Sequence, residues 1–416
     1  MSDSTGSGRD VVDAVAGGTG TWRRGAGVAG AAIGVVAAGA AVGVAVERLT
    51  VGRGMRRKAR LALDAAGPYG TLRGTPGRAV AADGTELYYE VDEIADHAAA
   101  GPAGAASGSA ESAPREPGRR LFGRRRPPLT VVFSHGYCLG QDAWHFQRAA
   151  LRGAVRTVYW DQRSHGRSAR GRTDPISIDL LGRDLKAVID AAAPEGPLVL
   201  VGHSMGGMTM MALAAQYPEL VAERVVGAAF IGTSAGRLAE DTYGLPVAAM
   251  NVVRRLLPGA FKLMSAQPEL IEKGRRATAD LFAGIVKRYS FESEDVDPAV
   301  ARFAERLIES TPVDVVAAFY PAFALHDKVE ALCAFDHRPV LVLAGQQDLI
   351  TPSAHSEAIA EALPDGRLVL VPDAGHMVMM EYPDLVSSHL AELLVAAGAS
   401  GARDGRRHAA GARQWG

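Results

Sequence analysis

Short apolar runs rich in Val and Leu alternate with stretches of helical periodicity over the C-terminal two thirds of the chain. Runs of this length bounded by turn residues are typical of buried strands. The pattern predicts strands at 129–134, 154–160, 197–202, 224–232, 339–345 and 366–372, and helices at 177–193, 205–218, 353–364 and 383–398. Since strands alternate with helices, we expect an α/β fold with a mainly parallel sheet and helices on both faces.

Two segments depart from this alternation. Residues 79–91 contain two short strand patterns on either side of Asp83-Gly84, a strong hairpin signal. Residues 234–337 carry helical patterns broken by prolines and show no clear strand. Because this stretch lies between two strands of the sheet, we expect a helical cap over the strands' carboxyl ends, where parallel sheets bind ligands.

Composition divides the rest of the chain. We expect the sheet domain at 75–233 and 338–397, with the cap at 234–337 between its two parts. Two segments without an apolar face, 95–128 and 398–416, are expected to be a flexible insertion and a disordered tail. The N-terminal part divides into a tail at 1–25, an uncharged run at 26–46 and a basic linker at 47–74.

The uncharged run at 26–46 is long enough for a transmembrane helix, because at about 1.5 Å per residue it reaches about 30 Å, the thickness of a bilayer core. The run is mostly Ala and Gly, so an export signal or an Ala-rich surface helix is the alternative. More Lys and Arg residues follow the run than precede it, which favours a cytoplasmic main domain. We therefore expect a single-pass anchor with lipid contact through this segment, an exported or soluble protein being the alternative.

Charge and cysteine content narrow the function. Hydrophobic residues make up 48 % and charged residues 22 % of the chain, as in an ordinary globular protein. The formal net charge of -1 disfavours a protein whose main role is coating nucleic acid. Two cysteines, Cys138 and Cys333, cannot form a disulfide framework or a four-thiolate zinc site. Nothing in the sequence matches a metal or nucleotide motif, so we expect no cofactor.

The strand predicted at 197–202 is followed by a G-x-S-x-G motif, residues 202–206, with Ser204 at its centre. The two glycines suit a sharp turn between strand and helix, where neighbouring backbone leaves no room for Cβ atoms and the serine hydroxyl is exposed. The pattern recurs at 232–236 around Ser234, but no helical pattern follows there. We therefore assign Ser204 as the nucleophile and Ser234 as a turn residue.

A serine hydroxyl needs a base, and the base needs a third group that fixes its tautomer. Among the histidines, His376 lies just past a predicted strand and ahead of the last helix, whereas the best rival, His355, falls inside a helical pattern. Asp348 directly follows the strand at 339–345, while Asp373 suits a local turn. We therefore predict a catalytic triad of Ser204, Asp348 and His376.

The reaction also needs donors for the oxyanion, and backbone N–H groups serve because they are fixed before the reaction starts. The amide of Met205 begins the helix after the nucleophile. The second amide is expected from Tyr137, in the loop that follows the strand at 129–134, where Gly136 permits a tight turn. Tyr137 and Met205 are thus the predicted oxyanion hole.

These motifs together resemble the α/β-hydrolase superfamily: SHGY at 134–137, DQRSHGRS at 161–168, GHSMGG at 202–207, GQQDLITP at 345–352 and PDAGHM at 372–377. The resemblance spans about 75–397, apart from 95–128. It implies the α/β-hydrolase fold with a helical cap and an esterase-like or lipase-like serine hydrolase. Members that use an aspartate nucleophile are disfavoured by Ser204.

The leading hypothesis is therefore hydrolysis of a small, apolar carboxylic ester through the triad and an acyl-enzyme. The same residues would also serve for a thioester, a lactone, a carbon–carbon bond or peracid formation. A membrane-tethered binding protein without catalysis is a third alternative, disfavoured because a binder has no need of an activated nucleophile.

Overall fold

One mixed sheet forms the centre of the computed structural model, which describes residues 60–65, 67–95, 127–171, 175–240, 247–277, 279–293 and 295–411. The strands are β1 (Thr75–Val80), β2 (Glu86–Asp92), β3 (Thr130–Ser134), β4 (Arg156–Trp160), β5 (Leu198–His203), β6 (Val225–Ile231), β7 (Val340–Gly345) and β8 (Arg367–Val371). Their order is β1-β2-β4-β3-β5-β6-β7-β8. The pairs β1–β2 and β2–β4 are antiparallel and the remaining pairs are parallel, which confirms the predicted sheet.

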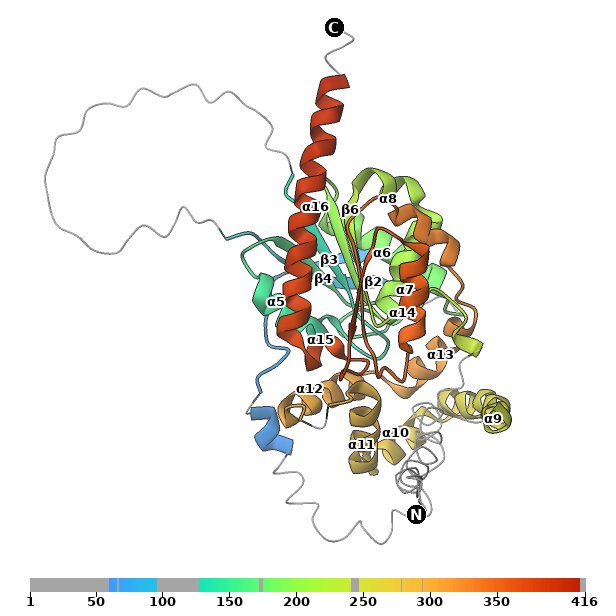
Figure 1. The fold of residues 1–416 in the computed structure, drawn as a ribbon. Helices are drawn as coiled ribbons and strands as arrows, with labels where there is room; N and C mark the ends of the chain where they lie inside the picture. The colour runs from blue at the N-terminus through green and yellow to red at the C-terminus, as the bar shows by residue number, and fades with distance from the viewer. Residues whose placement is uncertain are drawn as a thin grey trace, which may run out of the picture.

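Helices cover both faces of this sheet (Figure 1). One face carries α5 (His145–Leu151), α15 (Val378–Glu381) and α16 (Pro383–Gly411), and the other carries α6 (Ile178–Ala192), α7 (Met205–Gln216), α8 (Pro218–Arg224) and α14 (Ser353–Ala362). Short 3-10 helices are η2 (Gln141–Trp144), η3 (Leu238–Glu240) and η4 (Val329–Phe335). The helix α16 continues to Gly411, past the expected start of a disordered tail at 398.

Five helices between β6 and β7 gather at one end of the sheet (Figure 1). They are α9 (Val247–Ala266), α10 (Pro268–Ala277), α11 (Ala279–Ser290), α12 (Pro298–Glu309) and α13 (Val313–Ala324). Side chains of α9 and α13 line a pocket together with residues that follow β3, β5, β7 and β8. This cap, meaning α9 to α13 and their connections, therefore lies over the carboxyl ends of the parallel strands.

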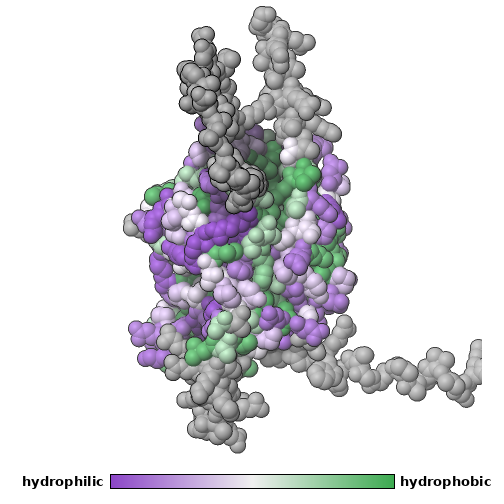
Figure 2. Space-filling view, turned by 90° about the vertical axis from the view of Figure 1, so that its left-hand side faces the viewer, coloured by the Kyte–Doolittle hydropathy of each residue, from purple (hydrophilic) through white to green (hydrophobic). Residues whose placement is uncertain are grey.

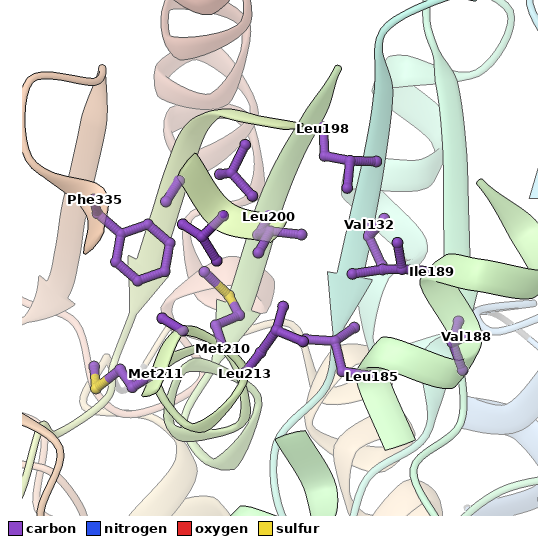
Figure 3. Close-up of a cluster of buried hydrophobic side chains, with 14 of the residues drawn as sticks. Val132, Leu185, Val188, Ile189, Leu198, Leu200, Met210, Met211, Leu213 and Phe335 are labelled. Carbon is purple, nitrogen blue, oxygen red and sulfur yellow. The ribbon is translucent and has the colours of Figure 1, made fainter. Parts of the chain in front are cut away.

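Side chains that point to opposite faces of the central strands build two apolar clusters. On the face of α6 and α7, Val132 and Leu200 of the sheet face Leu185, Met210 and their neighbours (Figure 3). Every residue of β5 is buried, which explains why its sequence is a continuous apolar run instead of an alternating one. Outside these clusters, much of the surface is polar, with an apolar band along the face that Figure 2 shows, as is ordinary for a folded protein.

The predicted single-pass membrane anchor is wrong for the structure described: none of its helices is long and apolar enough to cross a membrane. The cytoplasmic placement and the lipid contact argued from that anchor are withdrawn with it. The run was long enough, but Ala and Gly supply little of the transfer free energy that insertion requires. Residues 26–46 themselves lie outside the described residues, as do the expected tail at 1–25 and most of the insertion at 95–128.

The closest packing of α6 on α7 predicts a stability difference between two glycines. A Cβ on Gly182 of α6 would lie 2.7 Å from the backbone carbon of Ala212, whereas a Cβ on Gly284 of α11 would meet nothing within 4 Å. We expect Gly182→Ala to lower the free energy of unfolding by about 1–3 kcal/mol through overpacking. Gly284→Ala should leave it unchanged or raise it by up to about 1 kcal/mol, because helical Gly is unfavourable. Urea unfolding measures both, and a Gly182→Ala protein as stable as the parent would contradict this packing.

Candidate active site

Ser204 occupies a strained turn between β5 and α7. Its backbone has φ 52° and ψ −119°, a combination that residues other than glycine rarely adopt. A Cβ on Gly206 would overlap the carbonyl oxygen of Ser134, and one on Gly202 would overlap the backbone of Gly206 and Gly207. The two glycines of the motif are therefore required by backbone packing, and the turn directs the serine side chain into the pocket under the cap.

Asp348 and His376 come together from the loops after β7 and β8. The His376 Nδ1 lies 2.7 Å from Asp348 Oδ2. The other carboxylate oxygen, Oδ1, accepts hydrogen bonds from the amides of Ile350 and Thr351 at 2.7 and 2.9 Å, and the Thr351 hydroxyl donates to Oδ2 at 2.9 Å. Because a carboxylate only accepts, it places the imidazole proton on Nδ1 and leaves Nε2 as an acceptor.

Ser204 and His376 line the same pocket and are 7 % and 8 % exposed. No hydrogen bond joins the Ser204 hydroxyl to the imidazole within the described part of the chain. The structure thus brings the three predicted side chains to one rim of the sheet and pairs two of them directly. The distance between the Ser204 hydroxyl and the His376 imidazole depends on how the loop of His376 is held.

The neighbour of Ser204 helps to hold that loop. The imidazole of His203 is fully buried, and its Nε2 lies 3.0 Å from the backbone oxygen of His376. Burial lowers the pKa of His203 well below its ordinary value, so the ring is neutral and donates this hydrogen bond through Nε2. The rings of His203 and His376 lie 4.7 Å apart. A neutral ring beside the imidazole adds no positive charge that would oppose its protonation.

A glutamine that the sequence analysis did not single out fixes the loop after β3. The side chain of Gln162 donates through Nε2 to the backbone oxygen of His135 at 2.6 Å. The backbone N–H of Gln162 donates to His135 Nε2 at 2.9 Å. Its Oε1 accepts from Thr209 of α7 at 3.0 Å. Burial lowers the pKa of His135 to about 3, so this ring too is neutral. The loop that carries Tyr137 is therefore tied to the segment after β4 and to α7.

The predicted oxyanion donors, the amides of Tyr137 and Met205, follow β3 and β5, two strands that are neighbours in the sheet. Met205 is the first residue of α7, and the side chain of Tyr137 lines the pocket and donates its hydroxyl hydrogen to the backbone oxygen of Val316 in the cap. Neither backbone amide donates a hydrogen bond to a described residue. Their role as donors to an oxyanion stays a prediction.

Ser234 and His355, the alternatives to Ser204 and His376, contact each other. Ser234 is fully buried, its hydroxyl donates to the backbone oxygen of Gly236 at 2.7 Å, and it lies 2.9 Å from Nδ1 of His355. This contact joins the start of the cap to α14. Asp373 is exposed, and its backbone oxygen accepts a hydrogen bond from Tyr382. Neither serine nor carboxylate of this rival set lines the pocket.

The pocket has a volume of about 210 Å³ and a mainly apolar wall. The cap contributes Leu257, Phe261, Tyr289, Ser290, Ile308, Val316, Tyr320, Phe323 and Ala324, and the core contributes Leu139, Met208 and Met377 among others. Burial raises the pKa of Tyr289 to about 12 and that of Cys138 to about 12, so both are neutral. No group of three or more potential metal ligands occurs in the described residues.

A comparison with known families identifies the fold and its class of proteins. The family model described as alpha/beta hydrolase fold matches residues 130–383, more than half of the chain. The chain belongs to the α/β-hydrolase family. The predicted resemblance and fold class are confirmed by this match.

Curated relatives of this α/β-hydrolase have several activities in their names. A putative carbamate hydrolase of Caulobacter sp. strain K31 is 26 % identical over 273 residues, which is 64 % of this chain and 90 % of that protein. A mouse sn-1-specific diacylglycerol lipase is 29 % identical over 269 residues, 63 % of this chain and 80 % of that protein. Both of these relatives are named as hydrolases, and the substrates in their names differ.

Solved structures agree on the fold. An esterase from Thermogutta terrifontis matches with a TM-score of 0.55 and 23 % identity over 77 % of this chain and 98 % of that chain. The enol-lactonase from Burkholderia xenovorans LB400 matches with a TM-score of 0.55 and 21 % identity over 77 % of this chain and 100 % of that chain. At these identities the likeness supports the architecture and leaves the substrate open.

Proposed function

We propose that this α/β-hydrolase is a serine hydrolase that cleaves small apolar carboxylic esters through an acyl-enzyme on Ser204. The observation that carries the proposal is the Asp348–His376 pair, joined at 2.7 Å, whose imidazole lines the same pocket as Ser204 on its strained turn. A buried base whose tautomer is fixed by a carboxylate, beside a serine on such a turn, suits nucleophilic catalysis. The named hydrolases among its relatives support the same class of reaction.

In the first half of the reaction, Nε2 of His376 takes the hydroxyl proton of Ser204 as Oγ attacks the ester carbonyl carbon. The amides of Tyr137 and Met205 donate to the oxygen that becomes negative, and Asp348 stabilises the imidazolium. When the intermediate collapses, the bond to the alcohol oxygen breaks and His376 gives its proton to that oxygen. The products of this half are the free alcohol and the acyl group on Ser204.

In the second half, water attacks the acyl carbon while His376 removes one of its protons. Collapse then breaks the bond to Oγ, and His376 returns the proton to Ser204, which releases the carboxylic acid. Three hydrogen bonds from Ile350 and Thr351 hold Asp348 throughout, so the carboxylate does not need to reorient between the two halves.

The apolar wall of the pocket favours an acyl or alcohol part without charge. Phe261 and Tyr320 of the cap both line the pocket, and their rings contact each other in a tilted arrangement with centroids 4.5 Å apart. An ion placed there would lose its hydration without a compensating partner, which costs several kcal/mol in practice. We therefore infer that the substrates are neutral esters with an apolar chain.

A lactone is the second candidate substrate, because a 3-oxoadipate enol-lactonase of Acinetobacter baylyi is 26 % identical over 275 residues of this chain. A lactone is an ester whose alcohol remains attached after acylation, so the same residues serve. Comparison of kcat/KM for open-chain esters and for lactones of the same acyl length distinguishes the two substrates.

Replacement of the nucleophile tests the proposed function. We expect Ser204→Ala to lower kcat/KM for p-nitrophenyl butyrate by at least about 10³-fold, because the acyl-enzyme can no longer form. Ser234→Ala is the matched control, since it removes the same hydroxyl from the second G-x-S-x-G motif. A fluorophosphonate probe should label the parent and Ser234→Ala proteins but not Ser204→Ala. Full activity in Ser204→Ala, or a parent that neither reacts with the probe nor turns over esters, would reject the proposal.

A change in the cap should alter the preferred chain length. Phe261 lines the pocket, whereas Leu256 on the same helix is 62 % exposed and does not. We expect Phe261→Ala to raise the ratio of kcat/KM for p-nitrophenyl decanoate to that for the butyrate about 10-fold, because it opens space for further methylenes. Leu256→Ala should leave the ratio as it is. Equal ratios in all three proteins would show that the acyl chain does not bind under α9.

A further inference from the structure

Glu381, the last residue of α15, binds two parts of the molecule that belong to different units of the fold. Its Oε2 accepts a hydrogen bond from the amide of Gly375 at 2.7 Å, next to His376. Its Oε1 accepts hydrogen bonds from the amides of Glu292 and Ser293, at 3.0 and 2.6 Å. The first amide is in the loop of His376, and the other two are in the connection that follows α11 of the cap.

The same two segments also touch directly. The amide of Met377 donates to the backbone oxygen of Ser290 at 2.8 Å. A Cβ on Gly375 would lie 2.9 Å from the amide nitrogen of Glu292, so only glycine lets the backbones approach this closely. The cap segment 290–293 and the loop 375–377 are thus joined by four backbone amides whose acceptors are Glu381 and Ser290.

Both joined segments reach the pocket. Ser290 and its neighbour Tyr289 line it from the cap side, and His376 and Met377 line it from the core side. On the core side, the imidazole is held by Asp348 and the backbone oxygen by His203. The position of the cap segment is therefore one of the constraints on where Nε2 of His376 lies relative to Ser204.

A carboxylate has a specific use at this place. Each of its two oxygens accepts, so it can satisfy N–H groups that point at it from two sides, whereas an amide side chain presents one oxygen and one NH₂ group. In a Glu381→Gln protein, the side-chain NH₂ group would face at least one of these backbone N–H groups, and two donors cannot form a hydrogen bond with each other. The contact to one of the two segments would then be lost while the size of the side chain stays almost the same.

We propose that Glu381 is a positioning residue that fixes the loop of His376 to the cap, so that the distance from His376 Nε2 to Ser204 Oγ depends on the cap. This inference rests on the proposed serine hydrolase function and adds a residue to it. Glu381 does not line the pocket, and it acts through the backbone of Gly375. Its loss should impair proton transfer in the bound complex more than it impairs substrate binding.

The test compares Glu381→Gln with Asp373→Asn in the full chain. Asp373 is an exposed carboxylate three residues before His376 and accepts none of these hydrogen bonds through its side chain, so its variant controls for the loss of one negative charge near the imidazole. With p-nitrophenyl butyrate, we expect Glu381→Gln to lower kcat about 10- to 100-fold with KM changed less than about 3-fold, because small misplacement of a catalytic group is costly. Asp373→Asn should keep the parent's kcat.

Labelling by a fluorophosphonate separates this inference from the proposed function. Glu381→Gln should react with the probe to completion but more slowly, by the same factor as its kcat, because Ser204 is present and its base is misplaced. A parent that fails to react rejects the proposed function. A parent that reacts, together with a Glu381→Gln protein that reacts and turns over at the same rates as the parent, overturns only the role of Glu381.

A second variant covers the case in which Glu381→Gln does not fold. Glu381→Asp keeps two acceptor oxygens but shortens the side chain by one methylene, so it should fold and reach one of the two segments. We expect its kcat to fall below that of the parent, again with little change in KM. A lowered melting temperature with unchanged kcat in either variant would show a purely structural role and would contradict the inference.

Discussion

Backbone packing at the turn between β5 and α7 leaves no room for a Cβ atom at Gly202 or Gly206, and the proposed chemistry depends on this constraint. Cβ atoms on Gly202 or Gly206 would overlap the backbone of α7 or of β3. Because the strand must turn into the helix within so little space, Ser204 takes a positive φ and its side chain leaves the sheet toward the pocket. The strain is sustained by a fully buried strand and a helix that is buried almost all round.

The groups around this serine are held by different parts of the fold. Asp348 is fixed by its own loop, Tyr137 by the loop that Gln162 anchors, and His376 by contacts from the core and from the cap. Residues of both the sheet domain and the cap therefore form the pocket. The cap lines the pocket, and its segment 290–293 is hydrogen-bonded to the loop of His376 through Glu381 and Ser290, so under the two proposals the cap links substrate binding to catalysis.

The strands β3 to β8 were predictable to within one or two residues at each end, because central strands such as β5 are buried on both faces and have mostly apolar sequences. The predicted hairpin began at 79, whereas β1 begins at Thr75 and is largely exposed, so its sequence carries no such apolar run. The triad stays a prediction, and it could be made because each of its three members follows a strand of the sheet. Gln162 and Glu381 were not assigned roles, because their roles depend on contacts with segments distant in the sequence, His135 and Thr209 for Gln162 and the cap segment 290–293 for Glu381, and such contacts leave no local pattern. The membrane anchor was wrong because length alone was given more weight than the weak hydrophobicity of Ala and Gly.

The central claim is that catalysis passes through an ester bond between the substrate's acyl group and the oxygen of Ser204. Rapid acid quenching of the protein during turnover of a p-nitrophenyl ester, followed by intact mass measurement and peptide mapping, tests it most directly. We expect one added acyl group, located on the peptide that contains residues 202–207 and on Ser204 within it. Steady turnover with no covalent adduct, or an adduct on Ser234 instead, would contradict the account.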